Sequence, residues 1–186
     1  MKITQKNREK LIQNIVDQVK EAEIKLGYSK GVVRLYYPPE SLAGQMELPP
    51  MEADALAEAL ERSGEFADTP LGGLRFAVKQ GRIEVTVPSE GAEYVHVHVP
   101  EPPFLRALIE FFRAHHHSTL EEIRALFERF SPDYVCEQMP EGEDFQYLLY
   151  FPDGVVDSHY YCITDEMGHM TYHRFTKEDY LALMGA

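Results

Sequence analysis

Three short segments in the middle of the chain alternate apolar and polar residues, and this two-residue period constrains the fold more than any other feature. They read LRFAVKQ (74–80), RIEVTVP (82–88) and YVHVHVP (94–100). Successive side chains of a β-strand point to opposite faces, so each segment predicts a strand with one apolar and one polar face. Gln80 and Gly81 predict a tight hairpin between the first two. The segments together predict an antiparallel meander, packed on one side and solvated on the other.

The third segment carries two histidines on its polar face. The alternation places Val95, Val97 and Val99 inward and His96 and His98 outward, near Tyr94. We interpret the imidazoles as part of a solvated or partner-facing surface. The alternatives are a metal pair completed by a carboxylate such as Glu84, and a groove that binds a substrate.

Helical periodicity appears on both sides of the meander. A stripe at Leu11, Ile15, Val19, Ala22 and Leu26 predicts a helix over 7–26. We expect further helices over 52–62, 103–115, 119–131 and 177–184, a strand over 31–39, a loop over 40–50, and four strands over 134–140, 145–152, 158–164 and 170–176.

This order, α-β-α-βββ-αα-ββββ-α, predicts the α+β class. We expect seven to eight largely antiparallel strands in one sheet or two, with helices packed against them. Residues 1–186 are expected to form a single domain, in which the helix pair 103–131 joins two sub-lobes, 1–100 and 133–186.

The charge balance disfavours some classes of partner. Eighteen basic residues face 31 acidic ones, a formal net charge of -13. That balance disfavours nucleic acid or anionic membrane as a partner, because both are themselves anionic. The polar N-terminus does not resemble a signal peptide, and no run of apolar residues is long enough to span a bilayer. We therefore expect a cytoplasmic location.

Catalytic and metal-binding motifs are weak in this chain. His159, Cys162, His169 and His173 have zinc-like spacing, but residues 159 and 162 of a strand would lie on opposite faces. Cys136 and Cys162 form no framework and are expected to be reduced and partly buried, although a Cys136–His pair stays open. The LGGLRF stretch is typical of a turn before a strand, and matches no phosphate-binding loop. We expect no cofactor.

Tyrosines are concentrated in the predicted strands. Such side chains often line interfaces, because the ring packs while the hydroxyl stays in water. Arg34 lies beside paired tyrosines in RLYYPP, where we expect it to pair with a carboxylate, or else to hold a ligand anion. The candidate ligand or partner surface consists of Arg34, Tyr36, Tyr94, His96 and His98.

The stretch IKLGYSKGVVRLYYPPESL, residues 24–42, resembles the opening of a family of uncharacterised bacterial proteins. These proteins come mainly from Gram-positive anaerobes and carry a domain of unknown function. The resemblance implies a bacterial, single-domain, intracellular protein and brings no activity or catalytic residue with it.

Two functional hypotheses follow. The first is a non-enzymatic protein-binding or regulatory module that recognises another protein through a sheet face bearing tyrosine and histidine. Because acidic proteins attract basic ones, an immunity-like role would fit the charge. The second is a small metal- or anion-dependent enzyme with His96 and His98 at the mouth of a groove and Arg34 holding an anion.

Overall fold

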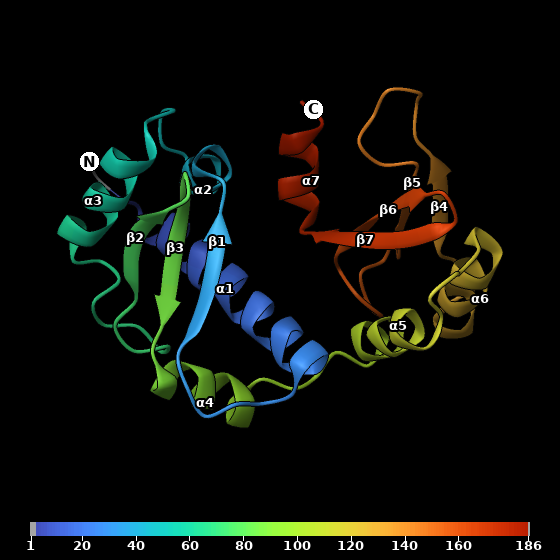
Figure 1. Ribbon diagram of the computed structural model, residues 1–186, viewed down its shortest axis with the longest axis horizontal. Helices are drawn as coiled ribbons and strands as arrows, with labels where there is room; N and C mark the ends of the chain where they lie inside the picture. The colour runs from blue at the N-terminus through green and yellow to red at the C-terminus, as the bar shows by residue number, and fades with distance from the viewer. Residues whose placement is uncertain (1–2, 186) are drawn as a thin grey trace. The chain divides into compact units, whose positions relative to one another are not determined.

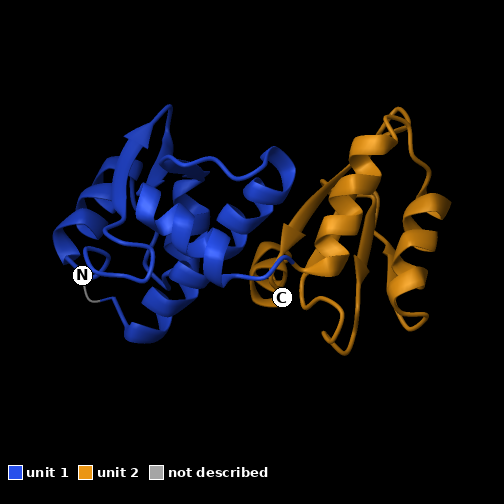
Figure 2. Cartoon of the chain, turned by 90° about the horizontal axis from the view of Figure 1, so that it is seen from below, with its two compact units in different colours: residues 1–101 blue, residues 102–186 orange. Residues whose placement is uncertain are grey.

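The computed structural model of the chain describes residues 3–185. The chain divides into two compact units, residues 1–101 (unit 1) and residues 102–186 (unit 2), coloured separately in Figure 2. Each unit has its own antiparallel sheet, of three strands in unit 1 and four in unit 2, with helices packed against it. The α+β class with seven antiparallel strands in the described residues is therefore confirmed.

Unit 1 is a three-stranded sheet with four helices. Its elements are α1 (Gln5–Leu26), β1 (Val33–Tyr37), α2 (Pro39–Gln45), α3 (Ala53–Ser63), β2 (Arg75–Lys79), β3 (Arg82–Val87) and α4 (Ser89–His98). The strand order β1-β3-β2 puts β3 in the centre (Figure 1). The hairpin expected at 80–81 is confirmed: Gln80 and Gly81 both have positive φ, 52° and 75°, as a type I′ turn requires.

One face of this sheet is packed against helices. Leu35, Phe76 and Val85 point into the core, together with the apolar stripe of α1 and the buried leucines of α2 and α3. In Figure 1, α1 crosses behind the strands. The opposite face carries the polar residues of the alternating pattern, which lie partly or fully in solvent.

The strand predicted over 94–100 is wrong, because residues 94–98 of this segment belong to helix α4. The expected inward row is broken: Val95 is fully buried whereas Val97 is 64% exposed. Ala92 and Val95 pack inward, and Val99 is half-buried, at helical spacing of three and four residues. A run of seven residues fits both periods, and the helix prevails because it buries Val95 and Val99 against the core of unit 1.

The loop expected over 40–50 is also partly wrong. Residues Pro39–Gln45 form α2, which opens with proline at its first position and buries Leu42 and Ala43 in the core. The order of elements in unit 1 is therefore α-β-α-α-β-β-α.

Unit 2 is a four-stranded sheet between helices. Its elements are α5 (Pro103–Ala114), α6 (Leu120–Phe130), β4 (Val135–Gln138), β5 (Tyr147–Tyr150), β6 (Tyr160–Glu166), β7 (His169–Phe175) and α7 (Lys177–Leu183). The strands follow one another in the order β4-β5-β6-β7. Phe104 of α5 and Phe127 of α6 contact Tyr161 of β6 on one face. On the other face, Tyr180 of α7 packs with Leu148 and Cys162.

Side-chain caps fix where two helices of unit 2 begin. Thr119 and Glu122 form a reciprocal capping box at the start of α6. Thr176 accepts a hydrogen bond from the backbone N–H of Asp179 at the start of α7. Within residues 3–185, none of the helices combines the length and the apolar character needed to cross a membrane.

Candidate functional site

The solvated face of the unit 1 sheet gathers basic side chains from all three strands. Register places Arg34, Thr86 and Arg75 in one row across the sheet. Tyr36, Glu84 and Ala77 form the next row, and Arg82 opposes Lys79 beyond it. We call this surface the open face; its residues are Arg34, Tyr36, Arg75, Ala77, Lys79, Arg82, Glu84 and Thr86.

The open face is positively charged and accessible. It presents four cationic side chains and one carboxylate, in a chain whose formal net charge is -13. The side chains of Arg34 and Lys79 are 52% and 58% exposed, and Tyr36 is 41% exposed. A concentration of cations on an otherwise acidic protein creates a local field of opposite sign.

The Glu84 carboxylate contacts three side chains of the open face. Its Oε2 accepts a hydrogen bond from the Tyr36 hydroxyl at 2.8 Å and lies 3.6 Å from Lys79 Nζ, while its Oε1 lies 3.9 Å from Arg34 Nε. The hydrogen bond from Tyr36, with the nearby charges of Lys79 and Arg34, lowers the pKa of the Glu84 carboxyl. One carboxylate therefore holds an aromatic ring and two cations in place.

Arg75 is held by a carboxylate on helix α3. Its Nε lies 3.2 Å from Glu61 of α3, and Glu61 Oε1 also accepts the backbone N–H of Phe76. The carboxylate thus satisfies an outward-facing donor of edge strand β2. Arg75 remains 76% exposed and keeps its outer nitrogens toward solvent.

The structure separates the five residues expected to share a surface. Arg34 and Tyr36 lie on the open face, whereas Tyr94, His96 and His98 lie on α4. Two residues apart on a helix means about 200° of rotation, so the two imidazoles leave α4 in different directions.

Each imidazole has its own contacts. His96 Nδ1 lies 2.9 Å from Glu23 Oε1, and its ring stacks on Tyr28 with the centroids 4.0 Å apart. His98 Nδ1 lies 3.1 Å from the Tyr94 carbonyl oxygen, and its ring stacks on Tyr94. Glu84, the suggested third ligand, pairs with Tyr36 instead. Across residues 3–185, no group of three or more His, Cys, Asp or Glu side chains is placed to hold a metal ion.

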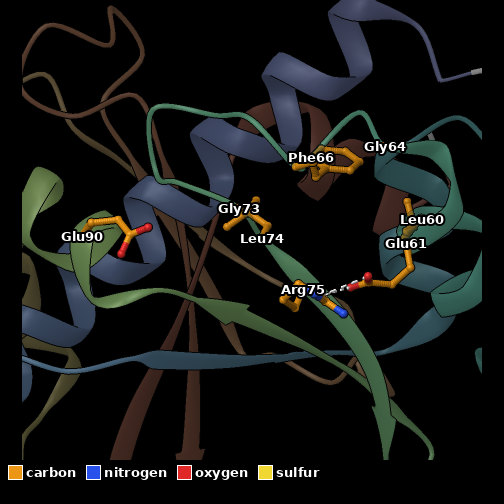
Figure 3. Close-up of a pocket in the computed structure, with 9 residues that line it drawn as sticks. Leu60, Glu61, Gly64, Phe66, Gly73, Leu74, Arg75 and Glu90 are labelled. Atoms are coloured by element: carbon orange, nitrogen blue, oxygen red, sulfur yellow. Dashed lines mark hydrogen bonds and ion pairs between the residues drawn. The ribbon is translucent and has the colours of Figure 1, made fainter.

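A pocket of about 330 Å³ opens beside β2 in unit 1. Its apolar wall is formed by Leu60, Phe66 and Leu74, all buried. Figure 3 shows the Arg75–Glu61 pair on one side and Glu90 of α4 on the other. The loop LGGLRF supplies Gly73 and Leu74, so this stretch does more than turn the chain.

Unit 2 contains a buried polar network. Asp157 Oδ1 accepts the backbone N–H of His159 at 2.8 Å, and Oδ2 accepts the Tyr161 hydroxyl at 3.0 Å. Arg174 Nη2 lies 3.9 Å from Asp157 Oδ2. Burial opposes ionisation of Asp157, but the hydrogen bonds from His159 and the charge of Arg174 outweigh it and lower the pKa of the carboxyl. The network ties the segment before β6 to β6 and β7.

Sequence reasoning did not place Arg75 and Lys79 on the site. The alternating pattern alone could have predicted that Arg75 and Lys79 are exposed, because they alternate with the inward-facing residues of β2. What the pattern does not give is the strand order. Only with β3 between β1 and β2 do these cations share a face with Arg34 and Tyr36.

Comparison with known protein families gives a match that covers most of the chain. The family described as a domain of unknown function from E. rectale (DUF3877) matches residues 8–184. The chain belongs to this family. The DUF3877 match confirms the resemblance seen at 24–42 and extends it over nearly the whole chain, so both units belong to the DUF3877 region. Neither the curated proteins nor the solved structures gave a match.

Proposed function

We propose that this protein is a non-enzymatic protein-binding module and that the open face of unit 1 is its binding surface. The observation that carries the proposal is the exposure of four cations around Tyr36 on one sheet face of a strongly acidic chain. Tyrosine and arginine are the residue types enriched where protein interfaces concentrate their binding energy. The complementary partner is a protein segment rich in Asp and Glu.

The acidic remainder of the chain narrows the class of partner. A nucleic acid is a long polyanion, and its whole charge would be repelled by a protein of net charge -13. A short acidic segment carries few charges and meets mainly the local field of the open face. An acidic protein segment is therefore favoured over a nucleic acid.

The chemistry of the open face supports binding rather than catalysis. A general base works best when its pKa lies near the working pH, whereas the hydrogen bond from Tyr36 lowers the pKa of Glu84 below its ordinary value. Glu84 serves instead to hold Tyr36, Arg34 and Lys79 in defined positions. Pre-positioned side chains lose less conformational entropy when a partner binds.

The proposal is tested by fluorescence anisotropy with a labelled peptide rich in Asp and Glu. Reversing two charges in Arg34→Glu/Lys79→Glu should weaken the affinity by about tenfold or more. Affinity should also fall as salt is added, because exposed charges are screened. A labelled Lys-rich peptide serves as the opposite-charge control.

The matched control is Lys30→Glu/Arg129→Glu, which changes the net charge equally at two exposed positions off the open face. It should leave the peptide affinity nearly unchanged. An equal loss of peptide affinity in both double variants would show that only net charge matters and would contradict the proposal. Absence of binding of the acidic peptide at low ionic strength would also contradict it.

A further inference from the structure

The pocket beside β2 combines an apolar wall with charged groups. Leu60 of α3, Phe66 of the following loop and Leu74 form the wall, and Ala67 and Gly73 complete it. Its volume of about 330 Å³ lies at the lower end of the range for small-molecule sites. A compact ligand with a short hydrocarbon part would fill it.

The charges of the pocket do not cancel. Glu61 is neutralised by Arg75, and its Oε1 also accepts the Phe76 N–H (Figure 3). Glu90 is different: among residues 3–185, no cation or hydrogen-bond donor is paired with its carboxylate. One unneutralised negative charge therefore remains at the pocket.

Two glycines bring Glu90 to this position. A Cβ on Gly91 would lie 2.2 Å from the Leu71 carbonyl oxygen, so the first turn of α4 meets the loop backbone directly. A Cβ on Gly72, whose φ is +77°, would lie 2.9 Å from Glu90 Oε1. The contact between α4 and the loop thus depends on residues without side chains, and it brings Glu90 to the pocket.

We infer that this pocket binds an organic cation, an amine on a short aliphatic chain. The hydrocarbon packs on Leu60, Phe66 and Leu74, and the ammonium group pairs with Glu90. The negative field of the whole chain raises the local concentration of such cations. The ligand is either a free small amine or a lysine side chain of another polypeptide; the chemistry is the same. The pocket shares Arg75 with the open face, but the inference does not depend on the proposed acidic partner.

The test is a titration of ¹⁵N-labelled protein with n-butylammonium, followed through the backbone amide signals of Gly73 and Leu74. Saturable shifts are expected with n-butylammonium, and none with butyrate, which has a similar chain and the opposite charge. Glu90→Gln should weaken amine binding about tenfold, through loss of a charge-assisted hydrogen bond. Glu93→Gln is the matched control, because Glu93 is exposed on the same helix and does not line the pocket.

A capped tripeptide Gly-Lys-Gly distinguishes the two sources of the amine. Binding as tight as that of butylammonium identifies a lysine side chain, whereas binding of butylammonium alone identifies a free amine. Ala67→Leu, at an exposed residue of the pocket lining, should block both by filling the space. Equal effects of Glu90→Gln and Glu93→Gln, or no saturable shift with the amine, would overturn the inference. Neither result would affect the proposal for the open face, since Arg75 is the one open-face residue that lines the pocket and the test of the open face changes Arg34 and Lys79.

Discussion

Tyr36 donates a hydrogen bond to Glu84 across the β1–β3 pair, with 2.8 Å between the hydroxyl oxygen and Oε2. The two residues are direct partners in the antiparallel register. This bond holds the phenol over the carboxylate and leaves the ring exposed between Arg34 and Lys79. The arrangement of the open face therefore depends on one cross-strand pair.

Tyr36→Phe should raise the pKa of Glu84 toward its ordinary value, because the hydrogen bond from Tyr36 is the largest cause of the lowering. Because the pKa of Glu84 is lower in the folded state, its charge stabilises the fold at any pH above the ordinary pKa. This stabilisation is lost as the pH falls through the lowered pKa of the folded state. NMR titration of the Glu84 carboxyl carbon measures the shift. Tyr94→Phe, in the same unit, should leave the titration of Glu84 unchanged. An unaltered Glu84 pKa in Tyr36→Phe would show that the bond is not formed in solution.

Asp157→Ala should reduce the free energy of unfolding by about 3 kcal/mol or more, because it removes the buried carboxylate that lies beside Arg174 and accepts the Tyr161 hydroxyl. The pKa of Asp157 is lowered on folding, so its contribution is present above an unfolded-state pKa of about 3.9. This stabilising contribution disappears as the pH falls through the lowered pKa of Asp157 in the folded state.

Chemical denaturation followed by circular dichroism at neutral and strongly acidic pH checks this prediction. The difference between wild type and Asp157→Ala should be large at pH 7 and small at low pH. Asp144→Asn removes one carboxylate at an exposed site of the same unit and should behave like wild type at both. A difference that persists unchanged in acid would contradict the role of the Asp157 charge.

The two thiols should differ in reactivity. Burial raises the pKa of Cys162 to about 12, and its side chain lies under α7 with Tyr180. Cys136 is half-buried. Only the thiolate reacts with alkylating reagents, so Cys136 should be labelled first at pH 8 and Cys162 only after unfolding. Peptide mass spectrometry after iodoacetamide treatment decides this; faster labelling of Cys162 in the native protein would contradict the packing of α7 on the sheet.

Two glycine-to-alanine changes should have opposite signs. Gly91→Ala drives a methyl group into the Leu71 carbonyl and should destabilise the protein by about 3 kcal/mol. Gly44 lies in α2 with open space where its Cβ would be, so Gly44→Ala should stabilise the protein by about 0.5–1 kcal/mol. Thermal unfolding of both variants measures the two effects, and a neutral Gly91→Ala would argue against the close contact between α4 and the loop at Leu71.

Periodicity identified most of the fold, since long helices and paired strands carry an unambiguous pattern. The Gln80-Gly81 turn is found where the sequence places it, and so is the stripe of α1 at Leu11, Ile15 and Val19. The end of the predicted stripe is wrong, because Leu26 is 87% exposed. The prediction for residues 94–100 was wrong because a run of seven residues can satisfy a strand period and a helix period at once. Val95 is buried and Val97 is exposed because α4 packs against the rest of unit 1. No local sequence pattern encodes this packing.

The candidate site was predictable only in part. Alternation put Arg34 and Tyr36 on a polar face, and they share the open face. The same argument assigned Glu84 to the histidines, whereas the strand order β1-β3-β2 gives it to Tyr36. The pocket brings Glu90 of α4 together with Leu60 and Glu61 of α3, which are distant from it in sequence, so spacing could not reveal it.

The most direct test of the binding surface is an NMR titration of the ¹⁵N-labelled protein with the Asp/Glu-rich peptide. The account predicts saturable shifts on β1, β2 and β3, strongest around Arg34, Tyr36 and Lys79, which disappear in Arg34→Glu/Lys79→Glu. Shifts that fall instead on α4 around His96 and His98, or no shifts at low salt, would contradict it.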